Sequence, residues 1–510
     1  METNKTITHR NVIDALDNVN SKDVVPSLNG GHQDSVALPA AQRLPVELWL
    51  KVLPNLGKNE HIILSTMNRS FRGAIRPHLF STFAIRFAWR PLSRDDPPND
   101  DLGIYLLYGD GPVDAKNRLH FYVSEEIAPL VKKCFFTLRC NGMVPRDAHY
   151  TEGEFLIQEF FTLLLKFSTL CHLELHGVAL SSDRIDQIRK LRHLDELRLT
   201  DSFFCEEDDS EQQLPISSFS ISQSHTRWLH QVDPEYTWTY TLAMAEPSRL
   251  THLHVWFHKC HDLESEFEPP MCTLLRYPIM DPNTRFSSLL SLRLPQFAIN
   301  SPHLVSFLER CPNLRELTLL ETGALHEEFD VNRPSHPLPS TILPRLHKLE
   351  APYYVLSSFT SCRMRELVIR EWTASQAVFD ILNRFDHPDC LEYLTIEVFP
   401  ITNVLLWSIC RRFKGLRSLS TIRKKHHKTP RVSEPEVIWD YMVQYLTILM
   451  TPTLEALSLE MSCSIPTPEV KDAFFDAMVK RCPNLESLEI LFTQGLRGFR
   501  PTKWQWARCS

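Results

Sequence analysis

The residue types that most often carry metal or acid–base chemistry gather at one place in this chain. His258, Cys260 and His261 lie in one short run, and Cys272 follows them. These side chains can bind zinc, but zinc sites usually draw their ligands from closely paired positions, and the Cys-x-x-Cys spacing is absent from the sequence. We therefore interpret the group as buried cysteines beside surface histidines, and we predict neither a metal site nor a cofactor.

Sequence motifs for catalysis are also missing. The chain contains no nucleophile-elbow GxSxG, no Walker A phosphate loop, no HExxH and no dinucleotide-binding glycine pattern. An enzyme whose site forms only on folding is the remaining alternative, and it would show as a pocket of groups with strongly shifted pKa values. We predict that the chain is not an enzyme.

Charge and cysteine usage exclude several other classes. The chain has 55 Lys and Arg against 62 Asp and Glu, a net charge of −7, whereas nucleic-acid binding needs a clustered basic excess. The basic run 423–428 is best interpreted as a solvated loop rather than a nuclear-import patch. The 13 cysteines stand singly, which favours reduced thiols. Because neither a signal peptide nor a membrane-length apolar stretch is visible, we expect a cytoplasmic or nuclear protein with no membrane contact.

The elements that must position any functional side chains begin with a helical stretch at residues 44–83. Pro45 suits the first position of a helix, and Glu47 suits the first turn, where the helix dipole favours an acid. Two apolar stripes at helical spacing follow, which are Leu48, Val52 and Leu56, and then Ile63, Met67, Phe71 and Ile75. Pro77 is expected to end the second helix, and residues 78–80 to form a short third one. So small a module cannot bury all this apolar surface, so part of it should contact a partner or the neighbouring domain.

This stretch resembles the F-box, the helical module that docks on the adaptor protein of SCF ubiquitin ligases. The resemblance rests on Leu44-Pro45, Glu47-Leu48, Val52-Leu53, Leu56 and the run 67–72. It differs from the common family pattern at Asn68, at Phe71 and at residues 60–62. The resemblance implies docking on the SCF adaptor, and through it on a cullin, by the residues Leu44, Pro45, Leu48, Val52, Leu53, Leu56, Ile63, Met67 and Phe71.

A second pattern repeats along most of the remaining chain. Its unit is an apolar residue, two variable residues, an apolar residue, one variable residue and another apolar residue. Clear copies begin at Leu170, Leu194, Leu250, Leu289, Leu314, Met364, Leu391, Leu454 and Leu485. Several copies are spaced within the 20–29-residue period of leucine-rich repeats. The junction Arg-Cys-Pro-Asn-Leu occurs at both 310–314 and 481–485, each time between an amphipathic helix and the next copy.

The repeats resemble the leucine-rich-repeat fold in an irregular form. We therefore predict an α/β protein, in which a three-helix F-box-like module precedes a solenoid with parallel strands inside and helices outside. Neighbouring repeats bury one another's apolar faces in such a stack. The expected divisions are a disordered arm at 1–40, the helical module at 41–85, a linker with the first strand and helix elements at 86–133, the solenoid at 134–495 with an insertion at 205–247, and a tail or cap at 496–510.

Residues between the apolar strand positions should point away from the core. Aromatic residues and arginine often dominate protein interfaces, whereas most such positions are simply solvated. The candidates for binding a target protein are His172, Glu174, Arg198, His254, Trp256, Arg293, Glu316 and Tyr393. The preferred hypothesis is a substrate-recognition subunit of an SCF-type ubiquitin ligase that binds an unknown target. The alternative is a repeat scaffold that binds a protein without ligase coupling.

Overall fold

In the computed structural model the chain divides into two compact units, Met1–Ala74 and Ile75–Ser510. The described residues are 51–67, 69–90, 106–109, 112–140, 151–204, 213–223, 242, 244–257, 275, 284–295, 298–299, 301, 303–320, 338–339, 341–373, 375–398, 403–422, 450–461, 467–492 and 502–508. The expected arm at 1–40, the histidine–cysteine group at 258–272 and the basic run 423–428 lie outside these residues.

The first unit contains the 3-10 helix η2 (Leu53–Asn55), helix α3 (Lys58–Met67) and the start of helix α4 (Arg69–Leu79). Leu53 is fully buried, and the ring of His61 is buried beside it. Nε2 of His61 lies 2.8 Å from the carbonyl oxygen of Leu53, so one hydrogen bond ties α3 to the first residue of η2. The unit ends at Ala74, and the expected module end at residue 85 instead lies within strand β1 (Thr82–Arg90).

The stripe from Ile63 to Ile75 predicted a single second helix, whereas the structure divides it between α3 and α4. The hydroxyls of Ser65 and Thr66 each donate a 2.7 Å hydrogen bond to the carbonyl three residues earlier, in the last turn of α3. Such local bonds compete with the helical pattern and favour its end. Pro77 does not stop α4, and residues 78 and 79 continue it. The helix ends so soon after Pro77 that its missing N–H disturbs only the last turn.

In the second unit, the described strands form one 16-stranded sheet, with neighbours in the order β18-β17-β16-β15-β14-β13-β12-β11-β10-β9-β8-β6-β4-β3-β1-β2. Every pairing is parallel except β1 with β2 and β17 with β18, which are antiparallel and lie at the two ends. Besides β1, the strands are β2 (Leu106–Gly109), β3 (Lys133–Cys140), β4 (His172–His176), β6 (Glu196–Thr200), β8 (Ser218–Gln223), β9 (His252–Phe257), β10 (Ser291–Pro295), β11 (Glu316–Leu320), β12 (Lys348–Pro352), β13 (Glu366–Thr373), β14 (Tyr393–Val398), β15 (Ser418–Ile422), β16 (Ala456–Met461), β17 (Ser487–Phe492) and β18 (Thr502–Ala507). A separate two-stranded sheet pairs β5 (Ala179–Leu180) with β7 (Phe203–Phe204).

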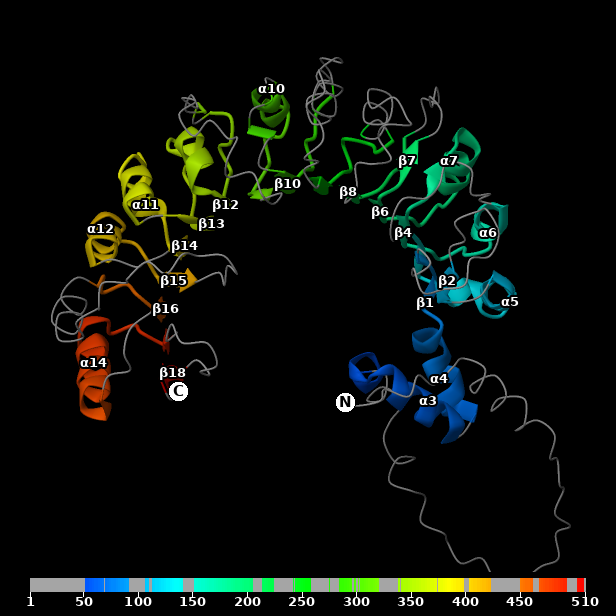
Figure 1. The fold of residues 1–510 in the computed structure, drawn as a ribbon, viewed down its shortest axis with the longest axis horizontal. Coiled ribbons are helices and arrows are strands. Elements are labelled where there is room, and N and C mark those ends of the chain that lie inside the picture. Colours follow the sequence, from blue (N-terminus) through cyan, green and yellow to red (C-terminus); the bar gives the residue numbers. More distant parts are fainter. Residues whose placement is uncertain are drawn as a thin grey trace, which may run out of the picture. The chain divides into compact units, whose positions relative to one another are not determined.

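Helices lie between many successive strands. In this unit the strands line the inner side of an arc, and the helices lie on its outer side (Figure 1). They are α5 (Pro112–Tyr122), η3 (Ala128–Leu130), α6 (Thr151–Leu164), α7 (Ser182–Arg189), α10 (Leu304–Glu309), η6 (Tyr353–Phe359), α11 (Ser375–Leu382), η7 (Pro388–Cys390), α12 (Asn403–Arg412) and α14 (Pro468–Arg481). None of the described helices is long and apolar enough to cross a bilayer.

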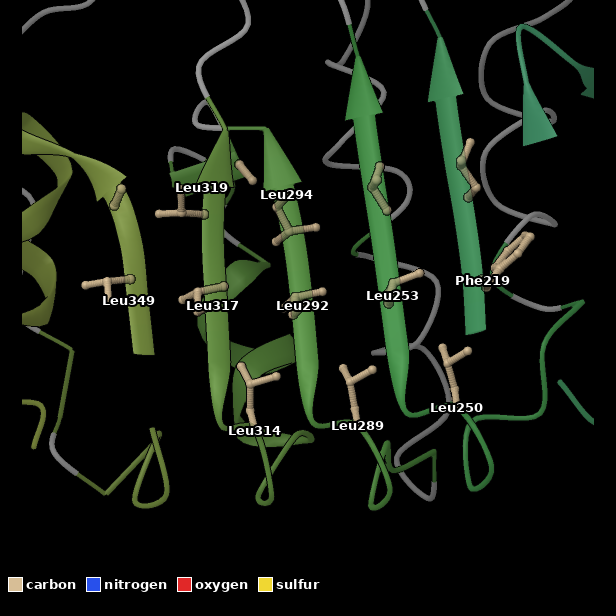
Figure 2. Packing of buried hydrophobic residues seen from close by; sticks show 14 of the residues in the cluster. Phe219, Leu250, Leu253, Leu289, Leu292, Leu294, Leu314, Leu317, Leu319 and Leu349 are labelled. Carbon is tan, nitrogen blue, oxygen red and sulfur yellow. The ribbon is translucent and has the colours of Figure 1, made fainter. Parts of the chain in front are cut away.

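The repeated apolar positions form continuous buried rows through the sheet. Leu253, Leu292, Leu317 and Leu349 pair at one register position on successive strands, and all are at most 1 % exposed. Figure 2 shows these leucines aligned from strand to strand. No single repeat buries such a face by itself, so the stacking of neighbours creates the core. The predicted pattern of aligned strand leucines is confirmed.

Two stretches contribute more to the sheet than their sequences indicated. Strand β8 lies inside the expected insertion at 205–247 and pairs with both β6 and β9, so this segment contains a repeat strand. Strand β1 pairs in parallel with β3, so the sheet already begins at Thr82, ahead of the expected solenoid start at 134. At the other end, β18 pairs along the free edge of β17, which satisfies backbone groups that an edge strand leaves open.

Candidate functional site

The candidate adaptor-binding residues fall into three groups. Leu44, Pro45 and Leu48 lie outside the described residues, and Met67 and Phe71 are placed only as backbone positions of α3 and α4. Leu53 is fully buried and Leu56 is half-buried, so Leu53 serves the core of the first unit. By contrast, Val52 is 43 % exposed and Ile63 is 63 % exposed, and both are available to a partner.

The candidate target-binding residues line rows across the sheet of the second unit. Parallel register places Glu174, Arg198, His254 and Arg293 in one row, with Ser220 between Arg198 and His254. Two residues earlier on each strand, a second row contains His172, Glu316 and Tyr393. Trp256 lies two residues after His254 and belongs to a third row. The sheet therefore brings distant candidates onto one face, and Ser220 is a neighbour that the sequence analysis missed.

Charges at the β4–β6 part of this face neutralise one another. Nδ1 of His172 lies 2.6 Å from a carboxylate oxygen of Glu196, and the guanidinium of Arg198 donates to the other oxygen at 2.6 Å. Burial by itself would raise the pKa of Glu196, but the hydrogen bonds from His172 and Arg198 lower it below its ordinary value. The His172 side chain is only 8 % exposed, so it supports Glu196 and is poorly placed to meet a target directly.

Charges at the β12–β14 part are paired as well. Arg370 donates to Glu350 at 2.8 Å and to Glu397 at 2.9 Å, and Lys348 lies 2.5 Å from Glu366. Sequence analysis did not single out Glu350, which lies on strand β12, between the clear copies of the repeat that begin at Leu314 and Met364. Its register position opposite Thr318 on β11 is the signal that would have found it.

Between these two parts lies a stretch of the face with a different character, which we call the central patch. It consists of the outward residues of strands β8, β9 and β10, namely Ser218, Ser220, Ser222, His252, His254, Trp256, Ser291 and Arg293. None of these side chains is a carboxylate. At the β11 border the hydroxyl of Ser291 donates to Glu316 at 3.4 Å.

The polar groups of the central patch are incompletely satisfied. Within the described part of the chain, Arg293 has no ion-pair or hydrogen-bond partner. Nδ1 of His254 lies 3.4 Å from the Ser220 hydroxyl, whereas its Nε2 is shielded from solvent and has no partner there. Burial, followed by the charges of Arg293 and Arg198, lowers the pKa of His254 to about 4. The imidazole is therefore neutral at physiological pH and sits in a positive potential.

Groups that could carry metal or thiol chemistry were sought among the described residues. Among them, no group of three or more His, Cys, Asp and Glu side chains is arranged to hold a metal ion. Burial raises the pKa of the Cys362 and Cys482 thiols to about 11, so neither is a ready nucleophile at neutral pH. The histidine–cysteine group at 258–272, interpreted above as buried cysteines beside surface histidines, lies outside the described residues.

The fold defines the class of protein to which the second unit belongs. Successive parallel strands begin 24 residues apart at β4 and β6 (172 to 196) and 25 apart at β10 and β11 (291 to 316). With aligned buried leucines and helices on the other side, this arrangement is a leucine-rich-repeat type of solenoid in an irregular form.

Comparisons with known proteins do not define a narrower family. No protein-family model matches the chain, and no curated protein matches it. Among solved structures, it is similar to a chain of the yeast Rad7 and Elc1 complex, with 13 % identity, a TM-score of 0.32 and coverage of 76 % of this chain and 87 % of that one. It is also similar to TLR13 in the TLR13–ssRNA13 complex, with 16 % identity, a TM-score of 0.36 and coverage of 72 % of this chain and 47 % of that one. A third similar structure is an internalin from Listeria monocytogenes, with 13 % identity, a TM-score of 0.26 and coverage of 63 % of this chain and 81 % of that one.

Proposed function

We propose that this chain is the substrate-recognition subunit of an SCF-type ubiquitin ligase. In this proposal the first unit docks on the SCF adaptor, and through it on a cullin, while the solenoid binds a target protein. The chain makes and breaks no covalent bond itself. It raises the local concentration of a target lysine at the ubiquitin-charged enzyme, which is a tethering effect.

The observation that carries the proposal is the exposure of Ile63. This apolar side chain on α3 is 63 % exposed, at a position where the F-box resemblance places an adaptor contact. Val52, from the first apolar stripe, is 43 % exposed. Exposed apolar side chains in so small a helical unit are what a docking surface needs. Singly spaced, buried cysteines such as Cys134 and Cys311 suit a reducing compartment, so the proposal places the complex in the cytoplasm or nucleus.

Co-expression of the full chain with the SCF adaptor tests the proposal. We expect a stoichiometric complex with the unaltered chain and its loss in a Val52→Asp, Ile63→Asp double variant, because a carboxylate would be buried unpaired in the interface. Asn59→Asp is the control for an added carboxylate, since it introduces one of the two negative charges of the double variant at an exposed position of α3 and should leave the complex intact. An unaltered yield from the double variant would contradict the proposal.

The alternative is a repeat scaffold that binds a protein without ligase coupling. It is favoured by Asn68 and Phe71, which differ from the common F-box pattern. The co-expression experiment separates the two functions. A scaffold would purify without the adaptor at every ratio tested, whereas a substrate receptor would form an equimolar complex that survives gel filtration.

A further inference from the structure

The residues that immediately precede successive strands form a row along one edge of the sheet, which we call the entry row. The backbone N–H of His347 donates to the carbonyl of Arg315 at 2.8 Å, and that of Arg365 donates to the carbonyl of His347 at 2.9 Å. The same bond recurs at each following step, so neighbours in the row lie about 4.8 Å apart, one strand spacing. Figure 2 shows this edge at the lower end of the strands, where Leu314 directly precedes Arg315. From β11 to β16 the entry row consists of Arg315, His347, Arg365, Glu392, Arg417 and Glu455.

From β13 to β16 the entry row alternates in charge and is paired within the chain. Arg365 donates to both carboxylate oxygens of Glu392, at 2.8 and 2.6 Å. Arg417 lies 3.6 Å from Glu392 and 3.4 Å from Glu455. The hydrogen bond from Arg365 lowers the pKa of Glu392 against the effect of burial, and the charges of Arg365, Arg417 and His347 lower it further. This edge therefore already binds a carboxylate through a bidentate arginine contact.

From β11 to β13 the same edge carries arginines that are not paired with a carboxylate. Arg315 and Arg363 are exposed, and within the described part of the chain neither side chain has a hydrogen-bond or ion-pair partner. Arg345 is exposed as well, and its guanidinium donates at 2.7 Å to the uncharged amide of Asn313. Arg345 and Arg363 each stand two residues before a member of the entry row. We call Arg315, Arg345 and Arg363 the arginine cluster.

Two carboxylates begin the adjoining strands, and both have other partners. Glu366, at the start of β13, pairs with Lys348 at 2.5 Å. Glu316, at the start of β11, accepts a hydrogen bond from the Ser291 hydroxyl at 3.4 Å. The alternation of the entry row therefore ends at Arg365, and beyond it the positive charge of the arginine cluster is open to solvent.

We propose that the arginine cluster binds an acidic segment of a partner protein, whose unmodified Asp and Glu side chains continue the charge alternation of the entry row. The contact between Arg365 and Glu392 supports carboxylates as the ligand, because it shows a guanidinium of this same edge holding one in a bidentate geometry. Isolated exposed ion pairs contribute little, so affinity must come from several contacts made together. This inference goes beyond the proposed function, since it applies equally to a ligase subunit and to a scaffold.

Other polyanions complement the arginine cluster less well. Single-stranded nucleic acids are usually held by basic grooves in which bases stack on aromatic side chains. The turns 310–315, 341–347 and 360–365, which lead into β11, β12 and β13, contain no Phe, Tyr or Trp. A membrane surface draws in exposed apolar side chains besides basic ones, whereas the large apolar side chains of these turns are buried, namely Leu314, Ile342, Leu343, Leu346 and Met364. An acidic protein segment needs only carboxylates.

The experiment measures the binding of fluorescent peptides to the full chain at low ionic strength. The probes are ten-residue peptides in which serine alternates with glutamate, glutamine or lysine. We expect the Glu–Ser peptide to bind at least about tenfold more tightly than the Gln–Ser peptide, and added salt to reduce this difference because it screens exposed charges. Equal binding of these two peptides would overturn the proposal. Tighter binding of a uridine decanucleotide, or of vesicles of phosphatidylcholine and phosphatidylserine, would overturn it in favour of a nucleic-acid or membrane surface.

Variants then assign the contact to the arginine cluster. An Arg315→Gln, Arg363→Gln double variant should lower the affinity for the Glu–Ser peptide by at least about fivefold. The matched control is an Arg192→Gln, Lys480→Gln double variant, which removes the same two charges at exposed positions before β6 and on α14. Unchanged affinity in a folded Arg315→Gln, Arg363→Gln protein would refute the assignment.

Charge reversal gives a readout that misfolding does not produce. An Arg315→Glu, Arg363→Glu double variant should lose the Glu–Ser peptide and bind the Lys–Ser peptide more tightly than the unaltered chain does. Thermal unfolding checks that the variant is folded. A folded charge-reversed protein that gains no affinity for the Lys–Ser peptide would contradict an electrostatic contact at these two positions.

The outcome is separable from that of the proposed function, because adaptor docking is tested at Val52 and Ile63 in the first unit. A chain that forms the adaptor complex but does not distinguish the Glu–Ser from the Gln–Ser peptide would refute the acidic-segment site alone. A chain that binds the Glu–Ser peptide through Arg315 and Arg363 but purifies without adaptor would refute the ligase proposal and support a scaffold that binds acidic segments.

Discussion

Arg293 on strand β10 lies directly beside His254 on strand β9 in the register of the parallel sheet. Two potentially cationic side chains therefore occupy adjacent positions of one row, and Arg198 lies two strands further along the same row. The pKa of His254 is lowered to about 4, first by burial and then by these arginines, so the folded state favours the neutral form of the imidazole.

This lowered pKa predicts how stability depends on pH. The ordinary pKa of 6.5 applies to the unfolded chain, so the unfolded state binds more protons than the folded state between about pH 6.5 and 4. The stability from the neutral imidazole is therefore complete above about pH 6.5 and is lost as the pH falls through about 4. We expect His254→Asn to flatten this part of the profile, measured as the urea midpoint from pH 7 to pH 4.

The control for this profile is His193→Asn, because His193 is exposed and is not one of the strand residues that make up the central patch. The charged and polar groups facing His254 are Arg198 on β6, Ser220 on β8 and Arg293 on β10, with His252 and Trp256 on its own strand.

Arg293→Ala should raise the pKa of His254 toward its ordinary value without reaching it, since burial remains. NMR titration of the His254 ring signals measures this pKa. The same titration midpoint in the unaltered chain and in the Arg293→Ala variant would contradict this electrostatic account.

Much of the solenoid was predictable from sequence, because each repeat must bury the same strand positions. Leu292 and Leu317 recur at one spacing, and stacking requires them to align. The face of the sheet was less accessible to such reasoning. Arg370 meets carboxylates that lie 20 and 27 residues away in the chain, and only the register of the sheet brings the three together.

The helical module shows a second limit of sequence reasoning. The apolar stripe from Ile63 to Ile75 predicts one continuous helix, whereas α3 ends within it. Periodicity alone does not detect the local hydrogen bonds of Ser65 and Thr66 in the last turn of α3. Likewise, Leu53 and Ile63 both belong to the expected apolar surface, yet one is fully buried and the other 63 % exposed. Which of them serves the core depends on packing within the unit.

The cluster at Arg370 predicts a stability loss with a defined rescue. Arg370→Ala leaves Glu397, whose side chain is 8 % exposed, without its guanidinium contact. A loss on the order of 1–3 kcal/mol in unfolding free energy is expected, because a largely buried carboxylate loses a hydrogen-bond partner. Adding Glu397→Gln should restore part of this stability, since it removes the negative charge that Arg370 compensates. Chemical denaturation measures both, and an absence of coupling in this double-mutant cycle would contradict the pairing.

Leu53 and Ile63 should respond differently to truncation. Leu53→Ala creates a cavity in the first unit and should cost about 2–5 kcal/mol of its local stability. Ile63→Ala removes an exposed side chain and should change stability by no more than about 0.5 kcal/mol. Hydrogen exchange of the α3 amides measures the local effect, and adaptor binding measures the functional one. Faster exchange in the Ile63 variant than in the Leu53 variant would reverse the assignment.

The bond between His61 and the Leu53 carbonyl gives a test of how the first unit is held together. A carbonyl oxygen can only accept, so Nε2 of His61 must carry the proton across the 2.8 Å separation. His61→Leu preserves bulk but leaves the carbonyl without this donor, and a loss on the order of 1–3 kcal/mol in local stability is expected. His61→Gln retains an N–H donor and should recover part of that loss. If both variants exchange their α3 amides at the same rate as the unaltered chain, the bond does not stabilise the unit.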